Sequence, residues 1–123
     1  MSERGQRVGA RGEELACEHL QRVGFEILER NFRTARGELD IIASDGRRIV
    51  FAEVKTRTAG SGQLNPMLSI GVHKRRQVRA MAGRWLAERK ERPRVSELRC
   101  DAIGIVLSPD GELLELEHLP GAF

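Results

Sequence analysis

The sequence has little cysteine and no long apolar run. Its two cysteines, Cys17 and Cys100, lack the C-x-x-C spacing of zinc and redox sites, so we expect small buried residues and no disulfide. No apolar run approaches the roughly 20 residues that a membrane-spanning helix needs. Residues 1–7 also lack the apolar core of a signal peptide. We therefore expect a cytoplasmic protein without a membrane partner.

The composition favours a nucleic-acid partner but offers little for stacking unpaired bases. Four phenylalanines, one tryptophan and no tyrosine occur among 123 residues. Residues 71–100 carry ten lysines and arginines against three acidic residues, a net charge of +7. Residues 101–123 carry five acidic residues and no lysine or arginine. Such a basic segment predicts contacts to duplex or branched DNA, the alternative being a basic helix face that is only solvated.

Two strands joined by a tight turn are predicted at residues 37–43 and 48–55, because Asp45-Gly46 between apolar runs is typical of a hairpin. A turn centred on that pair places Glu38 opposite Glu53 and Asp40 opposite Phe51. Because side chains alternate across a strand, one face then carries three acids and a lysine. That face comprises Glu38, Asp40, Glu53 and Lys55, continued by Ile42, Ile49 and Phe51. The opposite face comprises Leu39, Ile41, Ala43, Val50, Ala52 and Val54.

Three carboxylates and a lysine on apolar strands predict a divalent-metal site. Carboxylate oxygens are hard ligands suited to Mg²⁺ or Mn²⁺, which commonly bind substrate phosphate as well. Such a metal acidifies a bound water, and a nearby lysine offsets the negative charge of the reacting phosphate. The pattern thus indicates hydrolysis of a phosphodiester. The alternative is that Lys55 merely neutralises Glu53 or Glu38 in an ion pair.

Asp40 on one strand and Glu53-Val54-Lys55 on the next resemble the signature of the PD-(D/E)XK nuclease superfamily, which has the restriction-endonuclease-like fold. The whole chain more closely resembles the YraN family of small bacterial proteins, which is related in pattern to Holliday-junction resolvases. The residues that carry this resemblance are Gly12, Glu13, Ala16, Asn31, residues 37–43, residues 51–57, Lys74, Asp101, Ala122 and Phe123. The resemblance implies an α/β fold, Mg²⁺ or Mn²⁺ as cofactor, and DNA as substrate.

The resemblance also implies the roles of individual residues. The metal ligands are expected to be Asp40, Glu53 and Glu38, and the catalytic residues Asp40, Glu53, Lys55 and Glu13. Lys55 would position the attacking water. Many nucleases of this superfamily place a glutamate of the first helix beside the metal, and the resemblance selects Glu13. Spacing alone does not distinguish Glu13 from Glu14, and both acids also suit the start of a helix.

The DNA-binding residues are expected to be Lys74, Arg75, Gln77 and Arg57. Lys74 and Gln77 lie one turn apart near the start of a helix predicted at residues 73–89. In this superfamily, polar donors at that point often meet the scissile phosphate. Trp85 belongs to the apolar stripe of the same helix, so we expect it in the core and not against a base.

The remaining elements complete an α-β-β-β-α-β-β order, a mixed sheet flanked by helices. A first helix is predicted from Val8 or Arg11 to Val23. Gly9 and Gly12 weaken its first turns or, alternatively, permit close backbone approach to the sheet or to DNA. Further strands are predicted at residues 25–31, 98–107 and 113–118. Residues 1–123 form one domain, in which residues 1–6 are expected to be flexible and residues 57–66 to form a mobile loop.

The sequence therefore predicts a metal-dependent endonuclease-like protein that hydrolyses phosphodiesters in structured or branched DNA. One alternative is a non-catalytic nucleic-acid-binding module that retains the nuclease fold. Another is an adaptor whose basic face meets an acidic protein. Resolvases that make paired cuts act as dimers, so the resemblance is also compatible with a homodimer.

Overall fold

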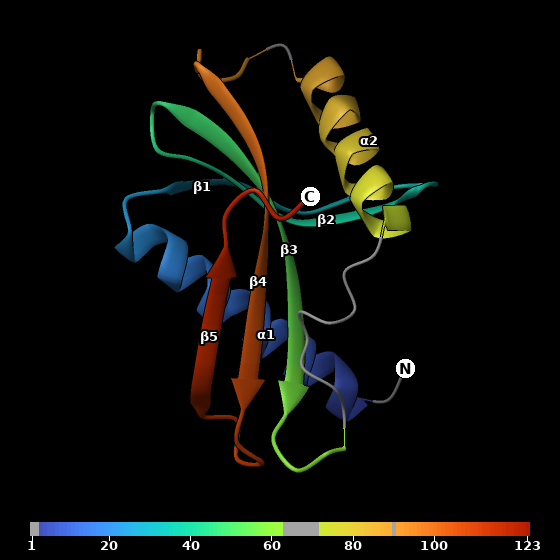
Figure 1. The fold of residues 1–123 in the computed structure, drawn as a ribbon, viewed down its shortest axis with the longest axis vertical. Coiled ribbons are helices and arrows are strands. Elements are labelled where there is room, and N and C mark those ends of the chain that lie inside the picture. The colour runs from blue at the N-terminus through green and yellow to red at the C-terminus, as the bar shows by residue number, and fades with distance from the viewer. Residues whose placement is uncertain (1–2, 63–71, 90) are drawn as a thin grey trace.

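A computed structural model describes residues 3–62, 72–89 and 91–123 (Figure 1). Its elements are α1 (Glu3–Arg22), β1 (Glu26–Thr34), β2 (Gly37–Ser44), β3 (Arg48–Thr58), α2 (Val72–Glu88), β4 (Glu97–Leu107) and β5 (Leu113–Leu119). The predicted α-β-β-β-α-β-β order is confirmed. Among the described residues, no helix is long and apolar enough to cross a membrane.

The five strands form one mixed sheet in the order β1-β2-β3-β4-β5. Every neighbouring pair is antiparallel except β3 and β4, which are parallel. A parallel pair needs a long crossover connection, and α2 lies in that connection, as predicted. The two helices pack on opposite faces of the sheet, so the fold has three layers (Figure 1).

Each helix covers its own apolar core. Leu15, Ala16 and Leu20 of α1 pack against apolar residues of β2, β3 and β4 on one face. Beneath α2, Val78, Met81, Ala82 and Trp85 pack on the other face. Trp85 is 2% exposed, packs edge-on against Phe51 and donates its indole N–H to Glu29 Oε1 at 3.1 Å. The prediction that Trp85 belongs to the core is confirmed.

The hairpin between β2 and β3 has a different register from the predicted one. Ile42 pairs with Phe51 and Ser44 with Ile49, so each residue of β2 is two positions from its expected partner. Gly46 is the first central residue of the turn, with φ of +89°, the backbone conformation that glycine adopts most readily. A shift of two residues keeps every side chain on its expected face, whereas a shift of one would exchange the faces.

Several element boundaries also differ from prediction. α1 begins at Glu3, so residues 3–6 lie in a helix, and that acid suits the positive end of the helix dipole. β3 continues to Thr58 because its parallel ladder with β4 extends to the Thr58–Leu107 pair. Arg57 therefore lies in a strand, and not in the predicted loop over residues 57–66. Residues 63–66 of that loop lie outside the described residues.

Gly12 allows α1 to approach β3 very closely. A Cβ added at Gly12 would lie 1.8 Å from Thr56 Oγ1 and 2.8 Å from Thr56 Cβ. At Gly9, by contrast, no atom would lie within 4 Å of an added Cβ. Close approach to the sheet is therefore confirmed at Gly12, whereas at Gly9 the helix does not approach the sheet closely.

We predict opposite stability effects for the same substitution at these two glycines. Gly12→Ala should destabilise the fold by about 2 kcal/mol, because rotating the Thr56 side chain does not remove the clash with its Cβ. Gly9→Ala should be neutral or stabilising by up to roughly 1 kcal/mol, since alanine has the higher helix propensity. Urea unfolding of both variants tests this, and equal effects would contradict the close approach at Gly12.

Candidate active site

The site lies where β2 and β3 part. Their ladder ends at the Ile41–Ala52 pair, after which β2 remains paired with β1 as far as Gly37 and β3 with β4 as far as Thr58. Past this point the backbone N–H of Val54 donates to Asp40 Oδ2 at 2.7 Å. The Asp40 carboxylate thus accepts the hydrogen bond that a backbone carbonyl of β2 would accept if the β2–β3 ladder continued. This bond fixes the carboxylate in the gap between the two strands.

The alternation of side chains on β2 breaks at the same point. Leu39 packs in the core beneath α2 with Ile42, whereas Ile41 packs in the core beneath α1. The prediction that Leu39 shares a face with Ile41 is wrong, although the other apolar residues of the hairpin keep their predicted faces. The strand therefore turns about its axis around Asp40, and groups from both faces of the sheet reach the gap.

Three carboxylates converge here from two elements. One oxygen each of Glu13, Glu38 and Asp40 lie within 4.8 Å of one another. Glu13 comes from α1, directly after the glycine that lets this helix approach β3. Its neighbour Glu14 is instead exposed and pairs with Arg11 at 3.7 Å. The structure thus brings Glu13, and not Glu14, to the carboxylates.

Burial and mutual repulsion raise the pKa values of two of these acids, Asp40 and Glu13. The pKa of Asp40 is raised to about 8 by burial and then by the charges of Glu53, Glu13 and Glu38, against the lowering effect of the Val54 hydrogen bond. Burial also raises the pKa of Glu13, which a hydrogen bond with Asp40 and the charge of Arg30 oppose. A site with excess negative charge of this kind favours a bound cation.

Basic and polar residues that the sequence analysis did not assign to the site surround the cluster. Arg33 Nε lies 2.7 Å from Glu38 Oε2, and Arg30 Nη2 lies 3.9 Å from Glu13 Oε2. Asn31 hydrogen-bonds Glu13 and has a φ of 55°, a left-handed conformation that asparagine tolerates better than most residues. Asn31 is one of the residues that carry the resemblance to the YraN family, and this was the only sequence signal that could have assigned it to the site.

Glu53 faces lysines from two elements. It is 5% exposed, and its Oε1 lies 2.7 Å from Lys74 Nζ and 3.8 Å from Lys55 Nζ. Its other oxygen, Oε2, is buried without a hydrogen-bond partner in the described part of the chain. A buried carboxylate oxygen without a partner is costly unless a cation or water satisfies it. Together with the neighbouring carboxylates, this donor set fits a hard divalent ion such as Mg²⁺ or Mn²⁺.

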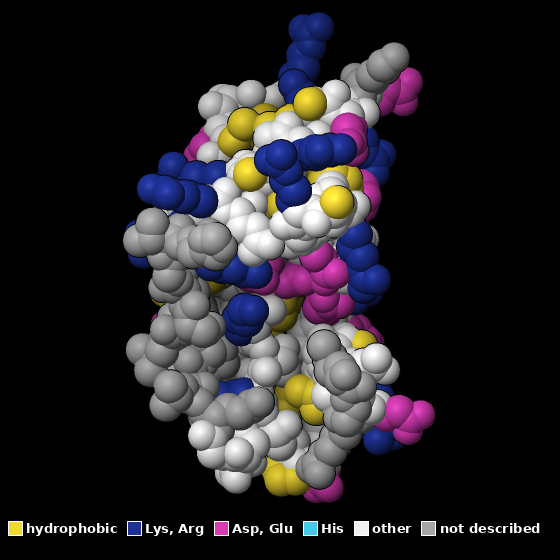
Figure 2. All heavy atoms as spheres, turned by 90° about the vertical axis from the view of Figure 1, so that its right-hand side faces the viewer, with side chains coloured by type: hydrophobic (Ala, Val, Ile, Leu, Met, Phe, Trp, Pro, Cys, Tyr) yellow, Lys and Arg dark blue, Asp and Glu magenta, His cyan; other side chains and the backbone are white. Residues whose placement is uncertain are grey.

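The predicted DNA-binding residues lie in different surroundings. Lys74 contacts the acidic site, and Arg75 beside it is exposed. Gln77 donates to the backbone carbonyl of Arg36 at 3.0 Å and packs on Gly37, so it supports the turn between β1 and β2. Arg57 is half-buried on β3. Figure 2 shows acidic side chains gathered in the middle of one face, with lysines and arginines around them.

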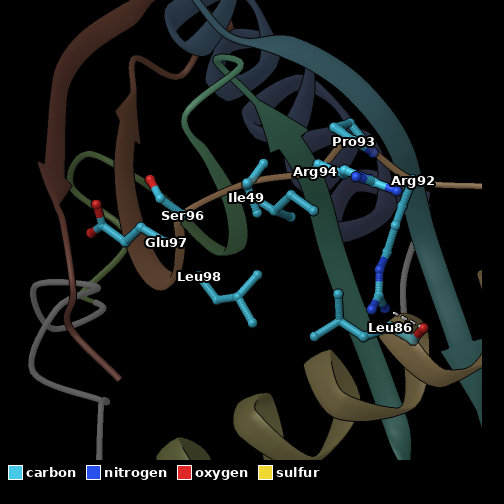
Figure 3. A pocket seen from close by; sticks show the side chains of 9 residues that line it. Ile49, Leu86, Arg92, Pro93, Arg94, Ser96, Glu97 and Leu98 are labelled. Atoms are coloured by element: carbon cyan, nitrogen blue, oxygen red, sulfur yellow. Dashed lines mark hydrogen bonds between the residues drawn. The ribbon is translucent and has the colours of Figure 1, made fainter.

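A cavity of about 720 Å³ lies away from this site, between the end of α2 and the start of β4 (Figure 3). Its lining is Ile49, Leu86, Leu98 and residues 92–97. The single carboxylate of this lining, Glu97, pairs with Arg48 at 3.2 Å. With one acid that is already paired, this cavity lacks the convergent carboxylates of the site between β2 and β3.

A second polar cluster, which the sequence analysis did not predict, joins α1, β4 and β5. His19 Nε2 lies 3.0 Å from His118 Nδ1, and His118 Nε2 lies 2.7 Å from Asp101 Oδ2. Asp101 is fully buried, also accepts hydrogen bonds from Arg99 and the Gly121 N–H, and has a pKa lowered by these partners against the effect of burial. Both oxygens of Asp101 are occupied by Arg99, His118 and the Gly121 N–H, so we assign this cluster to stability.

We predict that Asp40 makes the metal-free protein less stable as pH rises. Its folded pKa, about 8, exceeds the ordinary value of 3.8, so between these values the folded state binds this proton more tightly than the unfolded chain does. The free energy of unfolding should therefore fall across that window, by at most about 1.4 kcal/mol per pH unit from this group. Asp40→Asn should lack this contribution.

Urea unfolding of both proteins with chelator, from about pH 5 to about pH 8.5, measures the difference. The comparison cancels groups that titrate alike in both proteins. Parallel stability curves for the two proteins would contradict the raised pKa of Asp40.

Comparison with known proteins identifies the family. The chain is 45% identical to a UPF0102 protein of Geobacter metallireducens over 123 residues, which cover 100% of this chain and 97% of the relative. It is 46% identical to one of Geobacter sulfurreducens over 118 residues, covering 94% and 88%. It is 44% identical to a UPF0102 protein of Mycobacterium tuberculosis over 118 residues, which cover 93% of this chain and 90% of the relative. The family model matches residues 12–105. The resemblance to the YraN family is thereby confirmed, and the chain belongs to the uncharacterised protein family UPF0102.

Proposed function

We propose that this protein is a metal-dependent endonuclease of the restriction-endonuclease-like, PD-(D/E)XK type, which hydrolyses phosphodiesters in structured or branched DNA. The observation that carries the proposal is the buried, unpartnered oxygen of Glu53 beside the carboxylate of Asp40. In a purely structural ion pair, the oxygens of a buried carboxylate are normally satisfied by their partners. A site that awaits a cation accounts for it.

Asp40 and Glu53, with Glu38 and Glu13 beside them, would hold Mg²⁺ or Mn²⁺. When bound, the metal supplies an acidified water and polarises the phosphoryl group. Lys55 has a side chain that is 42% exposed, and its Nζ lies 3.8 Å from Glu53 Oε1, so it contacts both Glu53 and solvent. From there its ammonium group orients the attacking water and offsets charge that develops on the phosphate. The Val54–Asp40 hydrogen bond holds the nearest carboxylate rigidly during this process.

A basic groove leads away from the acids along α2 and supports DNA as the substrate. Its volume is about 420 Å³, and its lining is Thr34, Arg36, Arg76, Gln77, Ala80, Met81 and Arg84. Three arginines and no acid line it, and it begins beside Gly37, the residue before Glu38. Lys74 and Arg75 lie at the start of the same helix. A phosphate backbone that leaves the site along α2 would thus meet successive cations.

Cleavage of labelled DNA with Mn²⁺ tests the proposed activity. Linear duplex, flap and four-way-junction substrates should include at least one that wild type cuts. Asp40→Asn and Lys55→Ala should each lower the rate by about 10²-fold or more, because each removes a group that acts on the reacting phosphate or water. Chelator should abolish cutting in all samples.

The competing function is a non-catalytic nucleic-acid-binding module. It shares the basic groove and needs neither Asp40 nor Lys55 for binding. If wild type binds all three substrates and cuts none with any of several divalent metals, the nuclease proposal fails and the module is favoured. If it neither cuts nor binds them, an adaptor for an acidic protein is favoured.

Binding measured by fluorescence anisotropy tests the groove separately from catalysis. In an Asp40→Asn background, Arg76→Ala should weaken duplex binding and reduce the slope of log affinity against log salt by about 0.9, as expected for one lost phosphate contact. Arg22→Ala removes another exposed charge, at the last residue of α1, and should change the slope less. Affinity independent of salt would contradict binding of phosphates by this groove.

A further inference from the structure

Among the described residues, Lys74 is the nearest cation to Glu53 of the proposed metal site. Its Nζ lies 2.7 Å from Glu53 Oε1, whereas Lys55 Nζ lies 3.8 Å from the same oxygen. The Lys74 side chain is 27% exposed and that of Glu53 7%. A charge-assisted hydrogen bond shielded from water in this way is stronger than an exposed ion pair. Lys74 is therefore the main partner of Glu53 in the metal-free protein.

Lys74 reaches Glu53 from the side of the sheet that α2 covers, whereas α1 brings Glu13 from the other side. It belongs to α2, whereas Glu13 belongs to α1, and the two helices cover different faces of the sheet. The ammonium group is thus at the gap between β2 and β3, where Glu53 also repels the Asp40 carboxylate. A divalent ion held by Asp40 and Glu53 would have to share Glu53 with this ammonium group, or displace it.

We infer that Lys74 and the divalent metal compete for Glu53, and that Lys74 is a positioning residue that occupies the metal's carboxylate until the metal binds. The inference rests on the proposed function. Two positive charges on one carboxylate repel each other strongly where water is excluded. Metal binding therefore releases Lys74, which lies about one helical turn before Gln77 of the basic groove along α2.

A lysine suits this exchange better than an arginine. Its ammonium group is a single compact charge on a flexible four-carbon stem, and it makes no fixed two-point contact with a carboxylate. The exchange couples the two ligands of the protein, since metal binding frees a cation for phosphate and phosphate binding draws that cation away from Glu53. By linkage, each ligand should then strengthen the binding of the other.

Calorimetric titration with Mn²⁺, without DNA, tests the competition. Lys74→Met keeps an apolar stem and removes the charge, and it should bind Mn²⁺ about tenfold more tightly than wild type, as expected when one buried charge-assisted hydrogen bond no longer competes. Arg75→Met removes an equal charge from the next residue, which is exposed and pairs with no carboxylate among the described residues. Its Mn²⁺ affinity should stay within about twofold of wild type.

A double-mutant cycle with Glu53→Gln shows whether the effect acts through Glu53. The Lys74→Met substitution should change Mn²⁺ affinity much less in that background, because the contested carboxylate is absent. Thermal unfolding gives a second measure: without metal, Lys74→Met should unfold at a lower temperature than wild type, since it leaves Glu53 buried without its main partner. Saturating Mn²⁺ should raise the unfolding temperature of this variant by more than it raises that of wild type.

The outcomes separate this inference from the proposed function. If wild type binds Mn²⁺ and Lys74→Met binds it no more tightly, the competition is wrong while the metal site stands. If neither protein binds Mn²⁺, the metal site and the competition both fail. Binding by Lys74→Met with none detected in wild type would support the competition, because the ammonium group would then exclude the metal. An equal gain in Arg75→Met would attribute the change to net charge and overturn the inference.

Discussion

The hydrogen bond from the Val54 N–H to the Asp40 carboxylate is the interaction on which the site depends. A sheet that simply continued would pair β2 and β3 along their whole length and leave no gap between them. Here the ladder stops at Ile41–Ala52, and a side chain takes over the next backbone donor. The orphaned N–H is thereby satisfied, so the strands can part without the cost of an unpaired backbone group. The parting lets α1 supply a carboxylate and α2 an ammonium group to one place, which no single face of a closed sheet allows.

The site is kept together by charges that belong to different elements. Arg30 and Arg33 of β1 neutralise Glu13 and Glu38, and Lys74 of α2 neutralises Glu53. Most of these pairs are partly exposed; the side chain of Arg33, for example, is 72% exposed. Such pairs contribute little to stability, whereas Asp40, which pairs with no basic side chain in the described part of the chain, raises the cost of the cluster. The arrangement is poorly explained as a stabilising network. It is the pattern expected when stability is given up for binding of a cation.

The sequence supported the parts of the fold that follow from local pattern. Alternation correctly assigned Ile41, Ala43, Val50 and Ala52 to one core and Ile42, Ile49 and Phe51 to the other, and the 3.6-residue stripe correctly assigned Trp85 to the core. The register was wrong because Asp45-Gly46 fits a turn in more than one frame, and the frame that forms places Gly46 at the first central position. Leu39 was assigned to the wrong face because alternation assumes a regular strand, and β2 is irregular where it leaves β3. The pairing of Lys74 with Glu53 joins residues 21 positions apart through α2 packing, so no local pattern contains it.

The family model matches the part of the chain that carries the site and leaves out part of the structure that supports it. The matched segment begins at Gly12, the residue that lets α1 approach β3, and ends within β4 at residue 105. It contains all four carboxylates, both lysines and the whole lining of the basic groove, but not β5. β5 contributes His118 to the buried Asp101 cluster. In that cluster a single carboxylate is paired with a histidine and an arginine, whereas several carboxylates meet at the gap between β2 and β3. Within the fold, β5 therefore extends the sheet and closes the core beside α1. The segment that the family model matches carries the parted strands and the groups through which, by our proposal, a cation and a phosphate backbone would be bound.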